Sequence, residues 1–172
     1  LDMCSPKSFL TSGSFGTMGF ALPVAVGCQI ANPNDIVIAI DGDRSNLMNA
    51  GEYATIVEYN LPVKVIVMNN HGPGMVREFQ NILLGARHAA TKITSDINFA
   101  NIAKGFGFSY ARRVSDKAEL SSSIAEFMNE KEHSMLEVIT DSNEPVYPRI
   151  PYGKTDYKNM ELGPYIKERP IE

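Results

Sequence analysis

Two short apolar runs, separated by a stretch of helical length, constrain the fold of this chain more than any other feature. The runs are residues 35–40 (DIVIAI) and 63–68 (VKVIVM), and residues 49–59 between them carry apolar side chains at helical spacing. Continuous apolar runs of this length are typical of strands that are covered on both faces of a sheet. Strand, helix and strand in this order predict a parallel pair of strands with a right-handed crossover.

The same alternation continues along the chain. A glycine-rich turn leads into an apolar helix that ends near Asn32, and a helix closed by a glycine is expected over residues 99–107. Strands are expected over residues 109–114 and 135–140, with a helix over residues 116–130 between them. This order predicts an α/β fold, a doubly wound and mostly parallel sheet with helices on both faces.

The length of the chain predicts its domain organisation. A chain of 172 residues fits one domain with a sizeable core. We expect this domain to occupy residues 1–142. Residues 143–172 are rich in proline, tyrosine and charge, and we expect them to form an irregular tail packed on or over the domain. The chain begins with Leu1 and not with an initiator methionine, which is expected of a fragment or a processed product.

Charge and composition narrow the classes of partner. The formal net charge of −4 argues against a nucleic-acid or anionic-membrane surface, and no apolar run reaches the length of a membrane span. The two cysteines, Cys4 and Cys28, have no metal-type spacing, so a reducing cytoplasm is the expected location. A small anionic ligand remains compatible with this composition, because backbone amides and a metal ion can hold it.

Polar residues follow both apolar runs at the point where each strand is expected to end. Residues 41–43 (DGD) follow the first run, and residues 69–70 (NN) follow the second. Because ligands of parallel α/β sheets bind beyond the carboxyl ends of the strands, we expect Asp43, on a strand-end loop, and Asn70 to converge. Their oxygens suit Mg²⁺, and the flexible turn at residues 71–76 offers a backbone carbonyl as a further ligand. The alternative is that both dipeptides are ordinary turns.

These motifs and their flanks resemble the diphosphate-binding domain of thiamine-diphosphate enzymes, most closely the acetolactate synthase group. The family's Gly-Asp-Gly…Asn-Asn motif stands here as residues 42–44 (GDR) and 69–70 (NN). Residues 10–31, 52–70 and 74–80 are also similar to acetolactate synthases. The similarity is dense over the first half of the chain and is not evident in the tail.

The resemblance implies a set of cofactor-binding residues. The side chains of Asp43 and Asn70 and the backbone carbonyl of Gly72 would bind Mg²⁺, and the backbone around Gly42, Ser45, Gly72 and Gly74 would contact the diphosphate. Those six residues all come from the two strand ends and the segments that follow them.

The glycine-rich turn before the first helix supplies two more residues by the same resemblance. Met18 matches the bulky residue that supports the bent conformation of the cofactor, in which the aminopyrimidine approaches the reactive carbon of the thiazolium. Backbone at Gly16 would hold the aminopyrimidine. The alternative for Met18 is plain core filling, the commonest use of methionine on apolar stretches.

The resemblance also implies a reaction and partners. The chain is expected to be the diphosphate-binding domain or subunit of a 2-oxo acid decarboxylating carboligase that acts on a substrate such as pyruvate. The family's activating glutamate belongs to a pyrimidine-binding domain that nothing here matches, so another domain or subunit in a homo- or hetero-oligomer would supply it. Residues 46–51 (NLMNAG) resemble the β-type subunit of split 2-oxo acid decarboxylases, which is the alternative, together with a non-catalytic cofactor-binding module.

Two positions depart from the family pattern. Arg44 stands where the second glycine of the metal motif is expected, and Phe79 stands where acetolactate synthases have a tryptophan that helps select the second oxo acid. Arg44 either pairs with the diphosphate, obstructs it, or points to solvent. We expect obstruction, because a glycine at this point allows close approach of the backbone to phosphate and tolerates positive φ.

Overall fold

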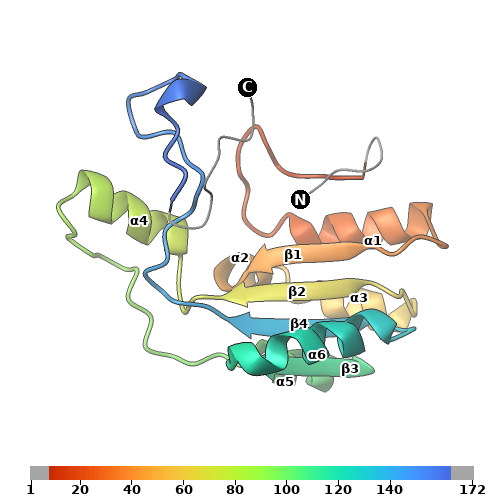
Figure 1. Ribbon diagram of the computed structural model, residues 1–172. Coiled ribbons are helices and arrows are strands. Elements are labelled where there is room, and N and C mark those ends of the chain that lie inside the picture. The colour runs from red at the N-terminus through yellow and green to blue at the C-terminus, as the bar shows by residue number, and fades with distance from the viewer. Residues whose placement is uncertain (1–7, 164–172) are drawn as a thin grey trace.

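The computed structural model describes residues 8–163 of the chain, and Figure 1 shows their arrangement. The helices and strands are α1 (Ala21–Ala31), β1 (Ile38–Gly42), α2 (Asp43–Met48), α3 (Glu52–Glu58), β2 (Lys64–Asn69), α4 (Gly74–Leu83), α5 (Phe99–Phe106), β3 (Tyr110–Val114), α6 (Lys117–Asn129), β4 (Ser134–Ile139) and the short 3₁₀ helix η1 (Tyr157–Asn159). Within residues 8–163, no helix is both long enough and apolar enough to cross a bilayer.

The four strands of the described residues form one sheet in the order β1-β2-β4-β3. Every neighbouring pair is parallel, and β1 pairs with β2 from Ile38 opposite Lys64 to Gly42 opposite Met68. The prediction of a mostly parallel α/β sheet is therefore confirmed. Because all four strands run in one direction, their carboxyl ends lie at the same end of the sheet, which we call its carboxyl edge.

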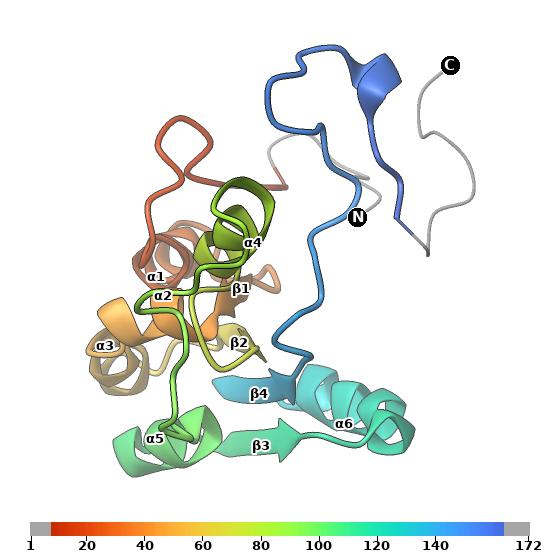
Figure 2. The same ribbon diagram turned by 90° about the vertical axis from the view of Figure 1, so that its left-hand side faces the viewer.

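Helices cover both faces of the sheet, as predicted. One face packs against α1, α3 and α5, and the other packs against α6, so that Figure 2 shows the strands between two layers. The first layer holds the larger core, in which Tyr53 and Phe99 are among the largest fully buried side chains. The second layer is shorter and leaves Ile38 and Ile40 of β1 exposed on its side.

The sequence pattern misplaced some boundaries. β1 begins at Ile38 and not at residue 35, and the helix expected over residues 49–59 is α3, which begins only at Glu52. The helix α2 before it was not expected. α2 is capped at Asn49, whose side-chain amide donates to the backbone oxygen of Gly19, a contact that helical periodicity does not reveal. The helix expected over residues 99–107 is α5, and Gly107 closes it in the left-handed conformation at φ +107.

The segment after β4 runs back over α4. It contains η1 and a single bridge between Arg149 and Glu161. The guanidinium of Arg149 pairs with the carboxylates of Glu78 on α4 and of Glu161. The ring of Tyr152 packs edge-on against Phe79 of α4, with 6.1 Å between the ring centroids.

Candidate functional site

Two functional side chains predicted from the sequence meet where β1 and β2 end side by side. Asp43 directly follows β1 and Asn70 directly follows β2, and the last residue of β1 is paired with Met68, the last but one of β2. One atom of the Asn70 amide group lies 3.1 Å from Oδ1 of Asp43. The parallel register therefore brings together two residues that are far apart in the sequence.

Asp43 lies in the first turn of α2 and not on the open loop that we expected. Gly42 is extended, with φ −82 and ψ 157, and the helix begins at the next residue. Only 2% of the Asp43 surface is exposed. Burial raises the pKa of the Asp43 carboxyl, and the adjacent Arg44 guanidinium opposes this rise. A carboxylate in this position is stabilised by any cation that reaches it.

The Asn70 amide faces two oxygen atoms. The atom that lies near Asp43 is also 2.6 Å from the backbone oxygen of Gly72. When the amide presents its oxygen here, three oxygens converge with no donor between them, which is an arrangement that a hard cation such as Mg²⁺ stabilises. When the amide presents its nitrogen, it donates to both oxygens and closes the site without a cation. The residues present therefore fit a metal ion.

The backbone of the turn after β2 brings Gly72 close to Asn70. His71 adopts φ +59, and its backbone N–H donates to Oδ1 of Asn69 at 3.0 Å. Gly74 starts α4, and a Cβ there would lie 2.2 Å from the Asn70 amide nitrogen. A Cβ at Gly72 would lie 2.9 Å from a guanidinium nitrogen of Arg77. Gly74 therefore allows close packing against Asn70, and Gly72 allows close packing against Arg77.

The glycine-rich turn is attached to α2, the helix that begins with Asp43. Oγ of Ser45 accepts a hydrogen bond from the backbone of Gly19 at 2.8 Å. Gly16 has φ +59 and turns the chain just before Met18, whose side chain is 39% exposed. Met18 is thus a partly exposed side chain on a turn that Ser45 holds, and not a filler of the core.

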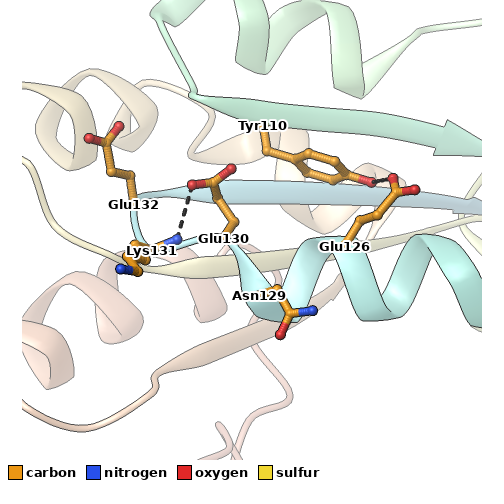
Figure 3. Close-up of a pocket in the computed structure, with 6 residues that line it drawn as sticks. All are labelled: Tyr110, Glu126, Asn129, Glu130, Lys131 and Glu132. Atoms are coloured by element: carbon orange, nitrogen blue, oxygen red, sulfur yellow. Dashed lines mark hydrogen bonds between the residues drawn. The ribbon is translucent and has the colours of Figure 1, made fainter.

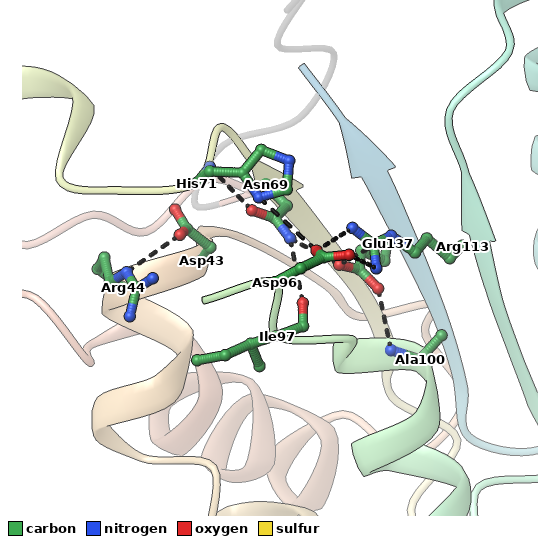
Figure 4. A network of polar contacts seen from close by, with 9 residues as sticks. All are labelled: Asp43, Arg44, Asn69, His71, Asp96, Ile97, Ala100, Arg113 and Glu137. Carbon is green, nitrogen blue, oxygen red and sulfur yellow. Dashed lines mark hydrogen bonds and ion pairs between the residues drawn. The ribbon is translucent and has the colours of Figure 1, made fainter. Parts of the chain in front are cut away.

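The side chain of Arg44 points toward Asp43, the residue before it. Its Nε lies 3.3 Å from Oδ2 of Asp43, and Figure 4 shows the pair. Arg44 belongs to α2 and has helical φ, so a requirement for positive φ plays no part at this position. The ion pair is therefore the structural feature that bears on the predicted obstruction, because it places the guanidinium beside the carboxylate.

A second acid–amide pair, which the sequence analysis missed, lies at the same edge of the sheet. Glu137 of β4 is fully buried and accepts hydrogen bonds from Nδ2 of Asn69 at 2.7 Å and from the backbone of Ala100 at 3.2 Å (Figure 4). Arg113 of β3 lies 3.7 Å from Glu137 and also pairs with Asp96. The signal in the sequence was an acid within the apolar run of β4.

The structure also has a shallow surface hollow, shown in Figure 3, at the other end of the sheet. Within it, the hydroxyl of Tyr110 donates to Glu126 and the backbone of Lys131 donates to Glu130. Tyr110 begins β3 and Glu132 precedes β4, so the hollow lies at the amino ends of these strands. Its lining residues are Tyr110, Glu126, Asn129, Glu130, Lys131 and Glu132.

The fold and the edge site together define a class, the parallel α/β domains that bind a cofactor beyond the carboxyl ends of their strands. Residues 1–138 match the family model described as the thiamine pyrophosphate enzyme, C-terminal TPP binding domain. The chain belongs to this family. Among residues 8–163 no group of three or more His, Cys, Asp or Glu side chains is placed to hold a metal ion, so a metal here would depend on amide and carbonyl oxygens as well.

The relatives identify the chain as a TPP-binding domain of the acetolactate synthase-like kind. It is 41% identical over 149 residues to the mitochondrial acetolactate synthase of Schizosaccharomyces pombe, covering 87% of this chain and 22% of that protein. It is 35% identical over 156 residues to the large subunit of acetolactate synthase isozyme 2 of Escherichia coli, covering 91% and 28%. The chain thus spans about a quarter of the length of these relatives.

A solved structure supports the same fold. The thiamine diphosphate-dependent 4-hydroxybenzoylformate decarboxylase of Rhodococcus jostii RHA1 superimposes with a TM-score of 0.67 at 28% sequence identity. The match covers 73% of this chain and 24% of that one. A thiamine-diphosphate-binding fold is therefore shared with a decarboxylase as well as with the synthases.

Proposed function

We propose that this domain binds Mg²⁺–thiamine diphosphate at the carboxyl edge of β1 and β2. One observation carries the proposal: a carboxylate oxygen of Asp43, the amide of Asn70 and the backbone oxygen of Gly72 converge within hydrogen-bonding distance. Mg²⁺ prefers oxygen ligands and usually keeps positions for substrate phosphates and water. Two side-chain ligands and one carbonyl leave such positions for a diphosphate.

The other residues of the site have roles around the cofactor. The backbone near Gly42, Ser45, Gly72 and Gly74 would approach the diphosphate, and Gly16 and Met18 would contact the aminopyrimidine and the bend of the cofactor. When bound, thiamine diphosphate supplies the electron sink for decarboxylation of a 2-oxo acid. The protein side chains hold the metal, fix the orientation of the diphosphate and, through burial of Asp43, keep a charged ligand away from bulk water.

For the whole protein we propose a 2-oxo acid decarboxylating carboligase of the acetolactate synthase type. Pyruvate is the proposed substrate, and a pyrimidine-binding domain or subunit would complete the active site in an oligomer. We keep the cytoplasm as the proposed location and residues 1–142 and 143–172 as the proposed division into domain and tail. Phe79, 53% exposed on α4, weakens the resemblance to the synthases, which have a tryptophan there. The second candidate is therefore the β-type subunit of a split 2-oxo acid decarboxylase, which residues 46–51 resemble.

Calorimetric titration of thiamine diphosphate into the chain, with and without Mg²⁺, tests the binding proposal. We expect binding that requires Mg²⁺ and that is absent in Asp43→Ala. Equal affinity with and without Mg²⁺, or in the variant, would contradict the proposed metal site.

The need for a partner domain has its own test. We expect the purified chain alone to release no CO₂ from pyruvate, because the activating glutamate of the family is proposed to come from elsewhere. Addition of a pyrimidine-binding domain should restore turnover. Sustained CO₂ release by the chain alone would contradict the proposal.

A further inference from the structure

We propose that Glu137 is a positioning residue that holds the turn after β2 in the geometry that the metal site requires. The inference rests on the proposed function, because it concerns the site that Asp43, Asn70 and Gly72 would form. The connection runs through two hydrogen bonds, one that Asn69 donates to Glu137 and one that the backbone of His71 in the turn donates to Asn69 (Figure 4).

Glu137 lies where packing alone would favour an apolar side chain. It is fully buried in β4, on the face of the sheet that also buries Met135 in the core. A buried carboxylate is costly unless it is paired and hydrogen-bonded, and apolar replacement is often neutral or stabilising. Here both carboxylate oxygens have partners, with Asn69 on Oε1 and the backbone of Ala100 on Oε2. The carboxylate is therefore best explained by the groups that it holds.

The first of these groups fixes the turn. Because Nδ2 of Asn69 donates to Glu137, Oδ1 of Asn69 faces away from Glu137 and accepts from the backbone of His71 at 3.0 Å. His71 has φ +59, a conformation uncommon for residues other than glycine, so it needs support from its surroundings. This conformation directs the backbone oxygen of Gly72 to within 2.6 Å of the Asn70 amide.

A second connection reaches the same turn from β3. Arg113 donates to both carboxylate oxygens of Asp96, and Oδ1 of Asp96 lies 3.8 Å from Nδ1 of His71. Arg113 also lies 3.7 Å from Glu137. The backbone of His71 is thus held by Asn69, and its side chain lies near Asp96. Glu137 connects to both sides, because it is bonded to Asn69 and lies near Arg113, the partner of Asp96.

The variant Glu137→Gln tests the inference with little change of shape. A glutamine has one acceptor oxygen, so it cannot accept from both Asn69 and Ala100 as the carboxylate does. We expect the Mg²⁺ concentration for half-maximal thiamine diphosphate binding, measured by calorimetry, to rise about tenfold to a hundredfold, the range for residues behind a metal ligand. We also expect faster hydrogen exchange of the His71 backbone amide, measured by NMR without cofactor.

Two further variants separate positioning from general loss of stability. Gln29→Ala removes a buried side chain that donates to the backbone oxygens of Asn32 and Asp35, before the amino end of β1, and should lower stability without raising the Mg²⁺ requirement. In a protein that already carries Asn69→Ala, adding Glu137→Gln should change the Mg²⁺ requirement no further, because the proposed effect passes through Asn69.

Each outcome decides the proposal. An unchanged Mg²⁺ requirement and unchanged His71 exchange in Glu137→Gln would overturn it, as would an equal rise in Gln29→Ala. If the unmodified chain binds no thiamine diphosphate, the proposed function fails, while His71 exchange still tests the role of Glu137. If Glu137→Gln does not fold, the His71 amide of the unmodified chain decides, and exchange at the rate of an unstructured loop would overturn the proposal.

Discussion

Asn69 and Asn70 are neighbours at the end of β2, yet their side chains lie in different surroundings. Asn69 is 1% exposed, and it donates to Glu137 and accepts from the backbone of His71. Asn70 is half-buried, and its amide faces Asp43 and a backbone oxygen. Asn69 is the last residue of β2 and Asn70 lies just beyond the strand, so two identical residues reach different partners.

The two acids at this edge differ in the same way. Glu137 has hydrogen-bond donors from two other elements and is part of the folded framework. Asp43 faces an arginine from its own helix, 3.3 Å away, and the side-chain amide of Asn70. That amide can present its oxygen toward a cation, or donate its N–H to Asp43 when no cation is bound. The comparison supports the proposals that the Glu137–Asn69 pair positions the site and that the Asp43–Asn70 pair binds the metal ion.

The largest expected effect is that of Asp43→Ala. It should weaken Mg²⁺-dependent thiamine diphosphate binding by more than about 100-fold, equivalent to more than about 2.8 kcal/mol, because the proposed metal ion loses its carboxylate ligand. The melting temperature without cofactor should change little. Calorimetry and thermal denaturation check the two parts. The control is Asp41→Ala, since Asp41 accepts from the backbone of Gly42 and should be dispensable for the metal.

Asn69→Ala tests the framework side of the comparison. It removes a donor from a buried carboxylate, so the free energy of unfolding should fall by about 1.5–3 kcal/mol, the range for hydrogen bonds to charged groups. Urea denaturation measures this change. Asn70→Ala is the matched control at the next position and should leave the free energy of unfolding nearly unchanged. Equal losses in the two variants would remove the distinction between the asparagines.

For cofactor affinity the comparison predicts the reverse order, with a larger effect at Asn70 than at Asn69. Asn70→Ala should lower Mg²⁺-dependent thiamine diphosphate affinity about tenfold to a hundredfold, because one oxygen ligand of the metal is lost while Asp43 remains. When the affinity is measured by calorimetry at saturating Mg²⁺, the variant should recover part of it. A variant that binds as tightly as the unmodified chain at low Mg²⁺ would exclude Asn70 as a ligand.

The smallest expected effect is a gain. Arg44→Gly should tighten thiamine diphosphate binding about twofold to fivefold, because an ion pair worth about 0.5–1 kcal/mol no longer competes with the metal for Asp43. Arg44→Met keeps the length of the side chain and removes its charge, so it should tighten binding as well if the ion pair is the cause. Weaker binding in Arg44→Gly, by about 1.5–3 kcal/mol, would instead make Arg44 a ligand of the diphosphate.

Much of the fold was predictable because it depends on local pattern. The apolar runs that became β1 and β2 are continuous and bounded by turn residues, and the glycine that closes α5 stands at the expected position. The helix α2 was not predicted, and its end at Asn49 involves a hydrogen bond to the backbone of Gly19, which is 30 positions away. Contacts across such distances leave no periodic signal.

The candidate site was predictable only in part for the same reason. Asp43, Asn70 and Gly72 followed from strand ends and from the family motif, while the expected loop at Asp43 proved to be the start of α2. Glu137 was missed because an acid in an apolar strand is visible in the sequence but its partners are not.

The sequence by itself determined the alternation of strands and helices, the parallel sheet, and the family of the chain. These depend on the spacing of apolar residues and on short motifs, which a linear pattern records. Only the tertiary structure decided which of two adjacent asparagines faces Glu137 and which faces Asp43, and that Arg44 contacts the acid before it. The physical reason is that hydrogen bonds and ion pairs act over about 3 Å, so their partners are set by how strands pack side by side and not by their order in the chain.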